Sequence, residues 1–464
     1  MELDLPYRPY QAPAKDKLVQ LKRAPLIAPM GSGKSLIALG ALAESVADMF
    51  AQPKPIVCPL NAVATWIREI QKWLGLPEEA IIVALGTKDQ RERAWKRAFN
   101  EKIPFIISSY TSFVNDADFI PKHLPNVILD EPHRVMRSRT ATWKHLCQWF
   151  LHSETLYLIT GTPMRKGPED FWPFLHMCNR KRFRGYWDYV NTWCLVHEGY
   201  FGKEICGPKN EDNFIKYIWG QHAAYVSDEE ADKYLPEKQR ILLPLEPTKK
   251  QRRLIEQIEG QIVQTPSGII LVPNTMSGIL RERQILCTPK ILDPSWEYGA
   301  GIDLIQDKLE DTAKDRPVIF TPFVAGLPHI KERLEKACTK DQKVHVLKGG
   351  THYKELQDTV KAFTESSNDR MLCTVSFAES FELPTSTEAF MLGADWSPDV
   401  NKQAEDRLRR LTNDSPKLTY YYLRHNRTVD GSVLERNNTK NRWVSRATPK
   451  SMQQLVDAVM EPVD

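Results

Sequence analysis

The segment Ala28-Pro29-Met30-Gly31-Ser32-Gly33-Lys34-Ser35 has the residue types of a phosphate-binding turn. It follows a short apolar run, 25–27, and precedes a run at 36–39 that favours a helix. Gly31 and Gly33 allow a tight turn whose N–H groups, with that of Ser32, face an anion at the positive end of the helix dipole. We therefore expect Lys34 to bind the β- and γ-phosphates of a nucleotide and Ser35 to bind Mg²⁺. An alanine stands where the general pattern has its first glycine, so an ordinary Gly/Ser turn is the alternative.

Two adjacent carboxylates, Asp130 and Glu131, end the apolar run 127–130. Carboxylates that follow a buried strand are costly unless a cation receives them. We expect Asp130 to hold Mg²⁺ through its water shell and Glu131 to orient and deprotonate the attacking water. The alternative is a solvated acidic pair in a turn.

Three further residues could contact a nucleotide. Gln11 precedes the phosphate-binding turn by about twenty residues, and its amide could fold back to bind adenine, because an amide both donates and accepts hydrogen bonds. A surface glutamine is the default interpretation. Arg407 and Arg410 are three residues apart, so a helix through them would place both guanidinium groups on one face, suited to phosphate oxygens. A solvated basic helix is the alternative.

The elements that must position these residues form two α/β patterns. Strands buried on both faces are predicted by continuous apolar runs at 55–59, 81–85, 105–108, 127–130 and 156–160, and again at 317–321, 344–347, 371–375, 389–392 and 418–422. Helix-like segments separate them, which is typical of parallel sheets. The second pattern contains no second phosphate-binding turn.

Size and composition narrow the class of protein. A chain of 464 residues predicts two or three domains. The formal charge of +4 is too small to indicate a polyanionic partner by itself, and no apolar run approaches the length of a membrane span. The eight cysteines form no C-x-x-C pair, which argues against a zinc ribbon or a disulfide framework. With no signal peptide at the start of the sequence, we expect a cytoplasmic protein that does not contact membranes.

The order of the motifs resembles the Swi/Snf branch of the superfamily-two helicases. The order is Tyr-Gln, Gly-Ser-Gly-Lys-Ser, Asp-Glu-x-His and then Thr-Gly-Thr-Pro at 160–163. Val57-Cys58-Pro59-Leu60 with Trp66 resembles motif Ia of that branch, and Ser108-Ser109-Tyr110 resembles motif Ib. The resemblance implies that the strand-end loops face nucleic acid. The DNA contacts that it implies are Pro59, Leu60, Trp66, Ser109, Tyr110, Gly349 and Gly350.

The same resemblance implies an α/β fold of two RecA-like parallel-sheet lobes with a mainly helical insertion between them. The expected boundaries are lobe 1 at 1–178, the insertion at 179–288, lobe 2 at 289–428, and a C-terminal brace or tail at 429–464. ATP with Mg²⁺ would bind in the cleft, with Arg407 and Arg410 as arginine fingers from lobe 2. Motif V departs from the family pattern, because Ser380 and Glu382 occupy its glycine and asparagine places.

The expected insertion shows a weaker resemblance to annealing helicases. Its segment 182–190 interleaves aromatic and basic residues; a small helical core is the alternative to a nucleic-acid contact. A strand, turn and strand are predicted at 262–271, either as a structural hairpin or as a pin that meets a duplex junction.

These observations predict a monomeric, ATP-driven translocase that remodels forked or branched DNA, with no particular protein partner indicated. The compact form favours a bacterial cell or a phage-infected host. An RNA helicase is the nearest alternative. A nucleotide-switched nucleic-acid-binding protein without motor activity is the second.

Overall fold

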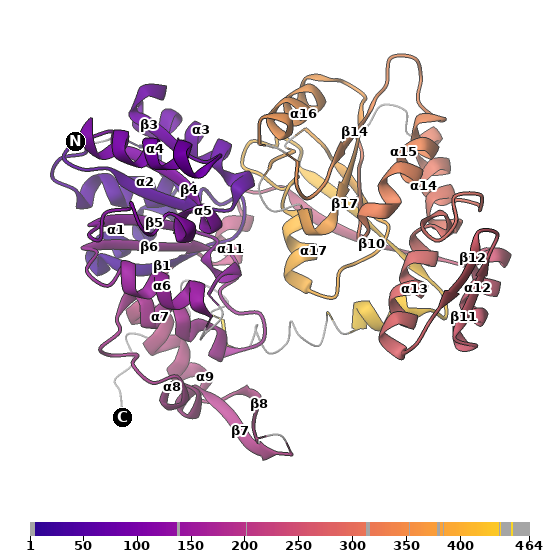
Figure 1. The fold of residues 1–464 in the computed structure, drawn as a ribbon, viewed down its shortest axis with the longest axis horizontal. Coiled ribbons are helices and arrows are strands. Elements are labelled where there is room, and N and C mark those ends of the chain that lie inside the picture. The colour runs from indigo at the N-terminus through magenta and orange to yellow at the C-terminus, as the bar shows by residue number, and fades with distance from the viewer. Residues whose placement is uncertain are drawn as a thin grey trace. The chain divides into compact units, whose positions relative to one another are not determined.

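The computed structural model describes residues 5–136, 140–200, 202–311, 316–351, 353–377, 381–383, 385–435, 437 and 447–448. The chain divides into two compact units (Figure 1). Unit 1 takes Met1–Leu235 together with Lys440–Asp464, and unit 2 takes Pro236–Thr439. The segment expected as an insertion, 179–288, is therefore shared between the two units rather than forming a compact body of its own.

Unit 1 contains a seven-stranded sheet in the order β3-β4-β2-β5-β6-β1-β9. All its pairings are parallel, which confirms the predicted sheet type. Its strands are β1 (Arg23–Ile27), β2 (Lys54–Cys58), β3 (Ile81–Ala84), β4 (Phe105–Ser109), β5 (Asn126–Asp130), β6 (Thr155–Thr160) and β9 (Ala224–Tyr225). The central strands β2 and β6 are buried along their whole length, as their continuous apolar sequence predicts.

Helices connect these strands and pack apolar residues against the sheet. They are α1 (Gln11–Leu21), α2 (Lys34–Ser45), α3 (Val63–Leu74), α4 (Lys88–Asn100), α5 (Tyr110–Asn115), α6 (Ala141–Trp149) and α7 (Trp172–Cys178). Helix α3 is typical: its buried residues include Val63, Trp66, Ile70 and Leu74, which recur every three or four positions.

The rest of unit 1 adds short helices and an antiparallel hairpin to the same core. Helix α8 (Tyr186–Trp193) leads into β7 (Cys194–Gly199) and β8 (Gly202–Pro208), a hairpin that the sequence did not predict. Figure 1 shows this hairpin projecting away from the seven-stranded sheet. Further along the chain, Trp219 packs against Phe171 and donates its indole N–H to the Ala447 carbonyl at 3.0 Å. Residue 447 therefore belongs to the core of unit 1.

Unit 2 is built on a six-stranded parallel sheet in the order β10-β17-β16-β13-β15-β14. Its strands are β10 (Glu237–Leu245), β13 (Val318–Thr321), β14 (Val344–Leu347), β15 (Arg370–Thr374), β16 (Glu388–Met391) and β17 (Lys417–His425). Five of them match the predicted strands. The sixth, β10, was not predicted, because its sequence is half-exposed and contains Pro244, which fits only at a sheet edge.

Helices of unit 2 include α14 (Ala300–Asp311), α15 (Leu327–Glu335), α16 (Tyr353–Glu365) and α17 (Pro398–Glu405). A satellite cluster joins α12 (Lys249–Glu259) and α13 (Thr275–Cys287) to the hairpin of β11 (Ile262–Thr265) and β12 (Gly268–Leu271). This hairpin confirms the strand, turn and strand predicted at 262–271. The C-terminal segment 452–459 and Ser380 of motif V lie outside the described residues.

Candidate nucleotide site

The predicted phosphate-binding turn lies between β1 and α2, as the sequence indicates. Gly31 and Gly33 have φ angles of 79° and 81°, in the left-handed region that glycine adopts without strain. Gly33 is also the residue that caps the N-terminus of α2. Lys34, the first residue of α2, donates from Nζ to the carbonyl oxygens of Ala28 at 3.1 Å and Pro29 at 3.2 Å.

Two N-terminal side chains brace this turn. The Tyr10 hydroxyl donates to the Ser32 carbonyl at 3.1 Å, and Gln11 Nε2 donates to the same oxygen at 2.8 Å. Gln11 Oε1 accepts the main-chain N–H of Arg8 at 2.8 Å, and the side chain is buried. The structure therefore brings Gln11 to the turn, where both ends of its amide are bonded within the protein; adenine binding by Gln11 stays a prediction.

The acidic pair ends β5, as predicted, and Glu131 is held by a compact hydrogen-bond group. Glu131 has a φ of 47°, a strained value for a non-glycine residue at the end of a strand. Thr160 Oγ1 donates to Glu131 Oε2 at 2.7 Å, and His133 Nδ1 lies 3.1 Å from the same oxygen and 3.0 Å from Thr160 Oγ1. The N–H of Thr162 also donates to Thr160 Oγ1, at 3.1 Å.

This group keeps the Glu131 carboxylate ionised. Burial by itself would raise the pKa of Glu131, but the hydrogen bond and charge of His133, the charge of Lys34 and the hydrogen bond from Thr160 outweigh it and lower the pKa below its ordinary value. A buried, ionised and immobilised carboxylate is suited to orienting a water molecule. The Thr-Gly-Thr-Pro motif is visible in the sequence, but the bond of its Thr160 to Glu131 is not.

The end of β6 also touches the phosphate-binding turn. A Cβ atom built on Gly161 would lie 3.3 Å from the Ala28 carbonyl oxygen and 3.5 Å from Lys34 Nζ. Glycine at this position therefore lets the strand end approach the lysine closely. The lysine, the carboxylate and the Thr160 hydroxyl consequently belong to one site in unit 1.

Asp130 is positioned by two residues that the sequence placed on the DNA. Trp66 Nε1 donates to Asp130 Oδ2 at 2.9 Å, and the Tyr110 hydroxyl donates to the Asp130 carbonyl at 2.8 Å. Both rings are buried, with exposed fractions of 2% for Trp66 and 6% for Tyr110. The hydrogen bonds of both rings are thus with the candidate metal ligand. The predicted DNA contact would be made by the segments that carry these two residues rather than by their rings.

The other predicted DNA residues lie at strand ends, as expected. Pro59 is buried, whereas Leu60 is exposed in the loop after β2. Ser109 caps α5 by accepting the Ser112 N–H at 3.1 Å. In unit 2, Gly349 and Gly350 follow β14 on an exposed turn, where Gly350 has a φ of 88°.

The two arginines lie in unit 2, but not on one helix face. Helix α17 ends at Glu405, so the prediction that a helix carries both residues is wrong. Arg407 is buried and donates to the Gln403 and Phe381 carbonyls at 3.1 and 2.9 Å, while its own carbonyl accepts the N–H of Leu383. The bonds with Phe381 and Leu383 connect the segment after α17 to motif V. Arg410 Nε lies 3.6 Å from Glu382 Oε1.

The residues of unit 1 fit ATP and Mg²⁺. The two left-handed glycines and the start of α2 form a turn suited to phosphates, with a lysine at its end. Ser35 and Asp130 offer hydroxyl and carboxylate oxygens, the ligand type that Mg²⁺ prefers. A bound Mg²⁺ would polarise the phosphate oxygens.

The fold and this site define a class, the two-lobed P-loop ATPases of the helicase type. Family models place the chain more narrowly. Residues 26–291 match the SNF2-related domain, and residues 300–412 match the helicase conserved C-terminal domain. The chain therefore belongs to the SNF2 family within the superfamily-two helicases.

Curated relatives align along most of the chain. Arabidopsis thaliana "Protein CHROMATIN REMODELING 5" is 25% identical over 448 residues, which cover 89% of this chain and 25% of the relative. Arabidopsis "ATP-dependent DNA helicase DDM1" is 21% identical, with 89% and 57% covered. Human "SWI/SNF-related matrix-associated actin-dependent regulator of chromatin subfamily A member 1" is 23% identical, with 89% and 40% covered. The chain thus spans a quarter to just over half of these relatives.

Among solved structures, the chain is similar to the "Sulfolobus solfataricus SWI2/SNF2 ATPase core in complex with dsDNA", with 18% identity, complete coverage of both chains and a TM-score of 0.44. Within the described part of the chain, no helix is both long and apolar enough to cross a membrane.

Proposed function

We propose that the protein is a DNA-dependent ATPase that uses ATP hydrolysis to move along DNA and to remodel forked or branched DNA. The observation that carries this proposal is the placement, in unit 1, of the Glu131, His133 and Thr160 hydrogen-bond group beside Lys34 of the phosphate-binding turn. This arrangement supplies positioning and charge neutralisation, which are the main requirements of phosphoryl transfer.

In this proposal, each candidate site residue has a defined task. Lys34 exchanges its carbonyl acceptors for phosphate oxygens when nucleotide binds. Ser35 and Asp130 hold Mg²⁺, and Glu131 orients water and accepts its proton. Arg407 and Arg410 belong to the second lobe and stabilise charge on the γ-phosphoryl group, and Gln11 contacts adenine.

DNA is proposed to contact the strand-end loops at Pro59, Leu60, Ser109, Gly349 and Gly350, together with the segments that carry Trp66 and Tyr110. These loops offer N–H groups and hydroxyls, which bind phosphate rather than base edges. Binding should therefore weaken with salt and be insensitive to sequence. A bacterial or phage source, a monomeric state and a cytoplasmic location stay predictions.

The deciding experiment measures ATPase rate with single-stranded DNA, intact duplex, forked DNA and RNA of equal length. Stimulation by DNA, with directional movement of a fork, would support the proposal. Stimulation only by RNA would favour an RNA helicase, and ATP-dependent release without movement would favour a nucleotide-switched binding protein. Relatives bear the names of chromatin-remodelling proteins, so a translocase on intact duplex is a further candidate. Movement on intact duplex without any effect on forks would favour it.

A further inference from the structure

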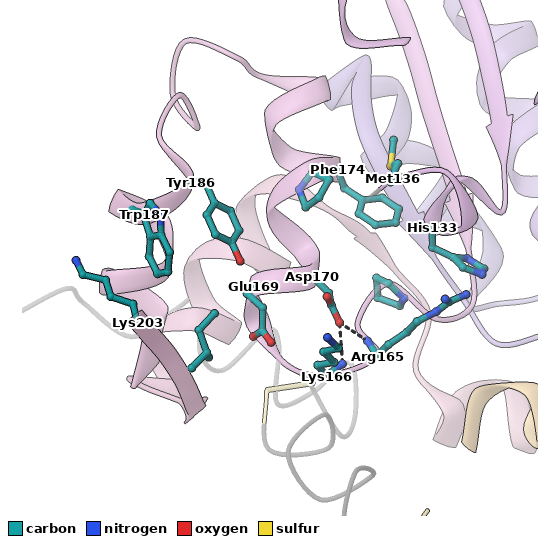
Figure 2. A pocket seen from close by; sticks show the side chains of 13 residues that line it. His133, Met136, Arg165, Lys166, Glu169, Asp170, Phe174, Tyr186, Trp187 and Lys203 are labelled. Carbon is teal, nitrogen blue, oxygen red and sulfur yellow. Dashed lines mark hydrogen bonds between the residues drawn. The ribbon is translucent and has the colours of Figure 1, made fainter. Parts of the chain in front are cut away.

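A cavity of about 740 Å³ lies in unit 1 beside the candidate site (Figure 2). Its walls come from the segment after β5, the loop after β6, helices α7 and α8, and the hairpin strand β8. The lining residues are His133, Met136, Pro163, Arg165, Lys166, Glu169, Asp170, Pro173, Phe174, Tyr186, Trp187, Lys203 and Ile205. Its volume lies within the range of about 300–1,000 Å³ typical of ligand pockets.

Two aromatic rings form one wall of this cavity. Tyr186 and Trp187 begin α8 and are partly exposed, with ring centroids 5.4 Å apart. Phe183 and Tyr189, from the same aromatic and basic segment, are instead buried in the core. Within segment 182–190, Phe183 and Tyr189 therefore belong to the core that was the alternative interpretation, whereas Tyr186 and Trp187 line the cavity.

Of the three cations that line the cavity, one lies at the rings and two lie toward its other end (Figure 2). Lys203 Nζ lies 5.4 Å from the centre of the Trp187 ring, and Arg165 and Lys166 come from the opposite, motif-bearing loop. Two acidic residues, Glu169 and Asp170, also line the cavity. Asp170 Oδ2 already accepts the main-chain N–H groups of Arg165 and Lys166, at 2.8 and 2.7 Å.

Two buried polar atoms of the lining add a further observation. His133 is more than nine-tenths buried and its Nε2 has no hydrogen-bond partner among the described residues. Arg165 Nε is also buried and without a hydrogen-bond partner in the described part of the structure. Since buried polar atoms are normally satisfied, both atoms indicate a polar ligand at this end of the cavity, while the rings indicate a flat, apolar group at the other.

We propose that this cavity binds an unpaired nucleotide of single-stranded DNA, with its base on Tyr186 and Trp187 and its phosphate toward Arg165 and Lys166. Aromatic rings combined with cations are the usual means of binding unpaired strands without sequence preference. The inference rests on the proposed function, because the forked DNA of that proposal is the source of the unpaired strand. His133 connects the cavity to Glu131, so an occupied cavity can influence hydrolysis.

The test measures binding of a fluorescent oligothymidylate and of a blunt duplex to the full chain without nucleotide. Stacking contributes about 1–3 kcal/mol per base, so Trp187→Ala should weaken oligothymidylate binding about five- to a hundredfold, and Trp187→Phe should restore much of it. Duplex binding should change less than about twofold. Tyr200→Ala is the matched control, because Tyr200 is an exposed aromatic between β7 and β8 that does not line the cavity.

Two further measurements make the result decisive. Photocrosslinking with a bromodeoxyuridine-substituted oligonucleotide should label the segment 186–205, and Lys166→Ala should lower the salt dependence of oligothymidylate binding by about one counterion. Unchanged oligothymidylate affinity in Trp187→Ala, an equal loss in Tyr200→Ala, or crosslinks only outside 186–205 would each overturn the inference. If duplex binding and DNA-stimulated ATPase persist in those cases, the proposed function stands while the cavity assignment fails.

Discussion

Substitution can distinguish the role of the lysine in the phosphate-binding turn from the role of the carboxylate at the end of β5. Lys34→Ala should abolish hydrolysis and sharply weaken ATP binding, because the ammonium group interacts with phosphate charge before and during the reaction. Glu131→Gln should bind ATP normally and stall, because it keeps its shape and loses the charge that receives a proton. Nucleotide binding by calorimetry beside ATPase rate checks both, and normal turnover in Lys34→Ala would contradict the assignment.

The hydrogen bond between Trp66 and Asp130 gives a prediction about metal binding. Trp66→Phe keeps an aromatic ring but removes the N–H that fixes Asp130 Oδ2. A hydrogen bond to a charged group contributes about 1.5–3 kcal/mol, so the Mg²⁺ concentration for half-maximal ATPase should rise about tenfold.

Trp73→Phe is the control for this change. Trp73 lies on the same helix and donates to the Glu69 carboxylate at 2.8 Å. It therefore loses the same kind of bond away from the site. An equal change in Mg²⁺ requirement for both variants would show that Trp66 acts through helix stability and not through Asp130.

Because α17 ends at Glu405, Arg407 and Arg410 lie in different surroundings and should respond differently to substitution. If Arg410 stabilises charge on the γ-phosphoryl group, Arg410→Ala should lower DNA-stimulated turnover by about 10³ to 10⁵ while ATP binding and nucleotide-free DNA binding change little. Arg410→Lys should rescue little, because a point charge cannot replace the planar guanidinium.

Arg407 should show an additional effect. Arg407→Ala leaves two carbonyl acceptors without their donor, so it should also destabilise unit 2 by about 1–3 kcal/mol. Arg409→Ala is a structural control, because Arg409 Nε donates to the Pro236 carbonyl at 2.7 Å. Turnover that persists in Arg407→Ala and Arg410→Ala while DNA binding collapses would make these residues nucleic-acid contacts.

The sequence predicted most strands because buried parallel strands are continuously apolar, as in β2 and β6. It did not predict β10, which is half-exposed and contains Pro244. It also did not predict the contact of Trp66 and Tyr110 with Asp130. That contact follows from the neighbouring order β4-β2-β5, which brings three strand ends together, and a linear sequence does not state strand order.

For the molecule as a whole, the stability of unit 2 should depend on acidity through the contact between β10 and α17. Arg240 donates to both oxygens of the buried Glu405 carboxylate, at 2.6 and 2.7 Å, and Lys238 lies 3.2 Å away. Burial would raise the pKa of Glu405, but Arg240 and Lys238 outweigh it and hold the pKa below its ordinary value of 4.5. The stabilisation is thus present above about pH 4.5 and lost as the pH falls through the lower, folded-state pKa.

Hydrogen exchange of the β10 amides across a pH series checks this dependence. In Glu405→Gln, protection of β10 should be lower at neutral pH and should fall less steeply on acidification. Glu246→Gln, which affects an exposed carboxylate beside Arg252, should match the unaltered protein. Identical pH profiles for all three proteins would show that the Glu405 cluster does not stabilise the strand.

The return of residue 447 to the core of unit 1 has a consequence for how the chain withstands cutting. The polypeptide passes from one unit to the other twice, near Leu235 and again near Thr439. In the chain, unit 2 is therefore inserted between the two segments that form unit 1. A protease that cleaves only near Leu235 would produce two fragments that still copurify, because the Trp219 indole and the surrounding core retain the end of the second fragment. Unit 2 is thus attached to unit 1 at both of its ends, and the second attachment includes the noncovalent packing of residue 447.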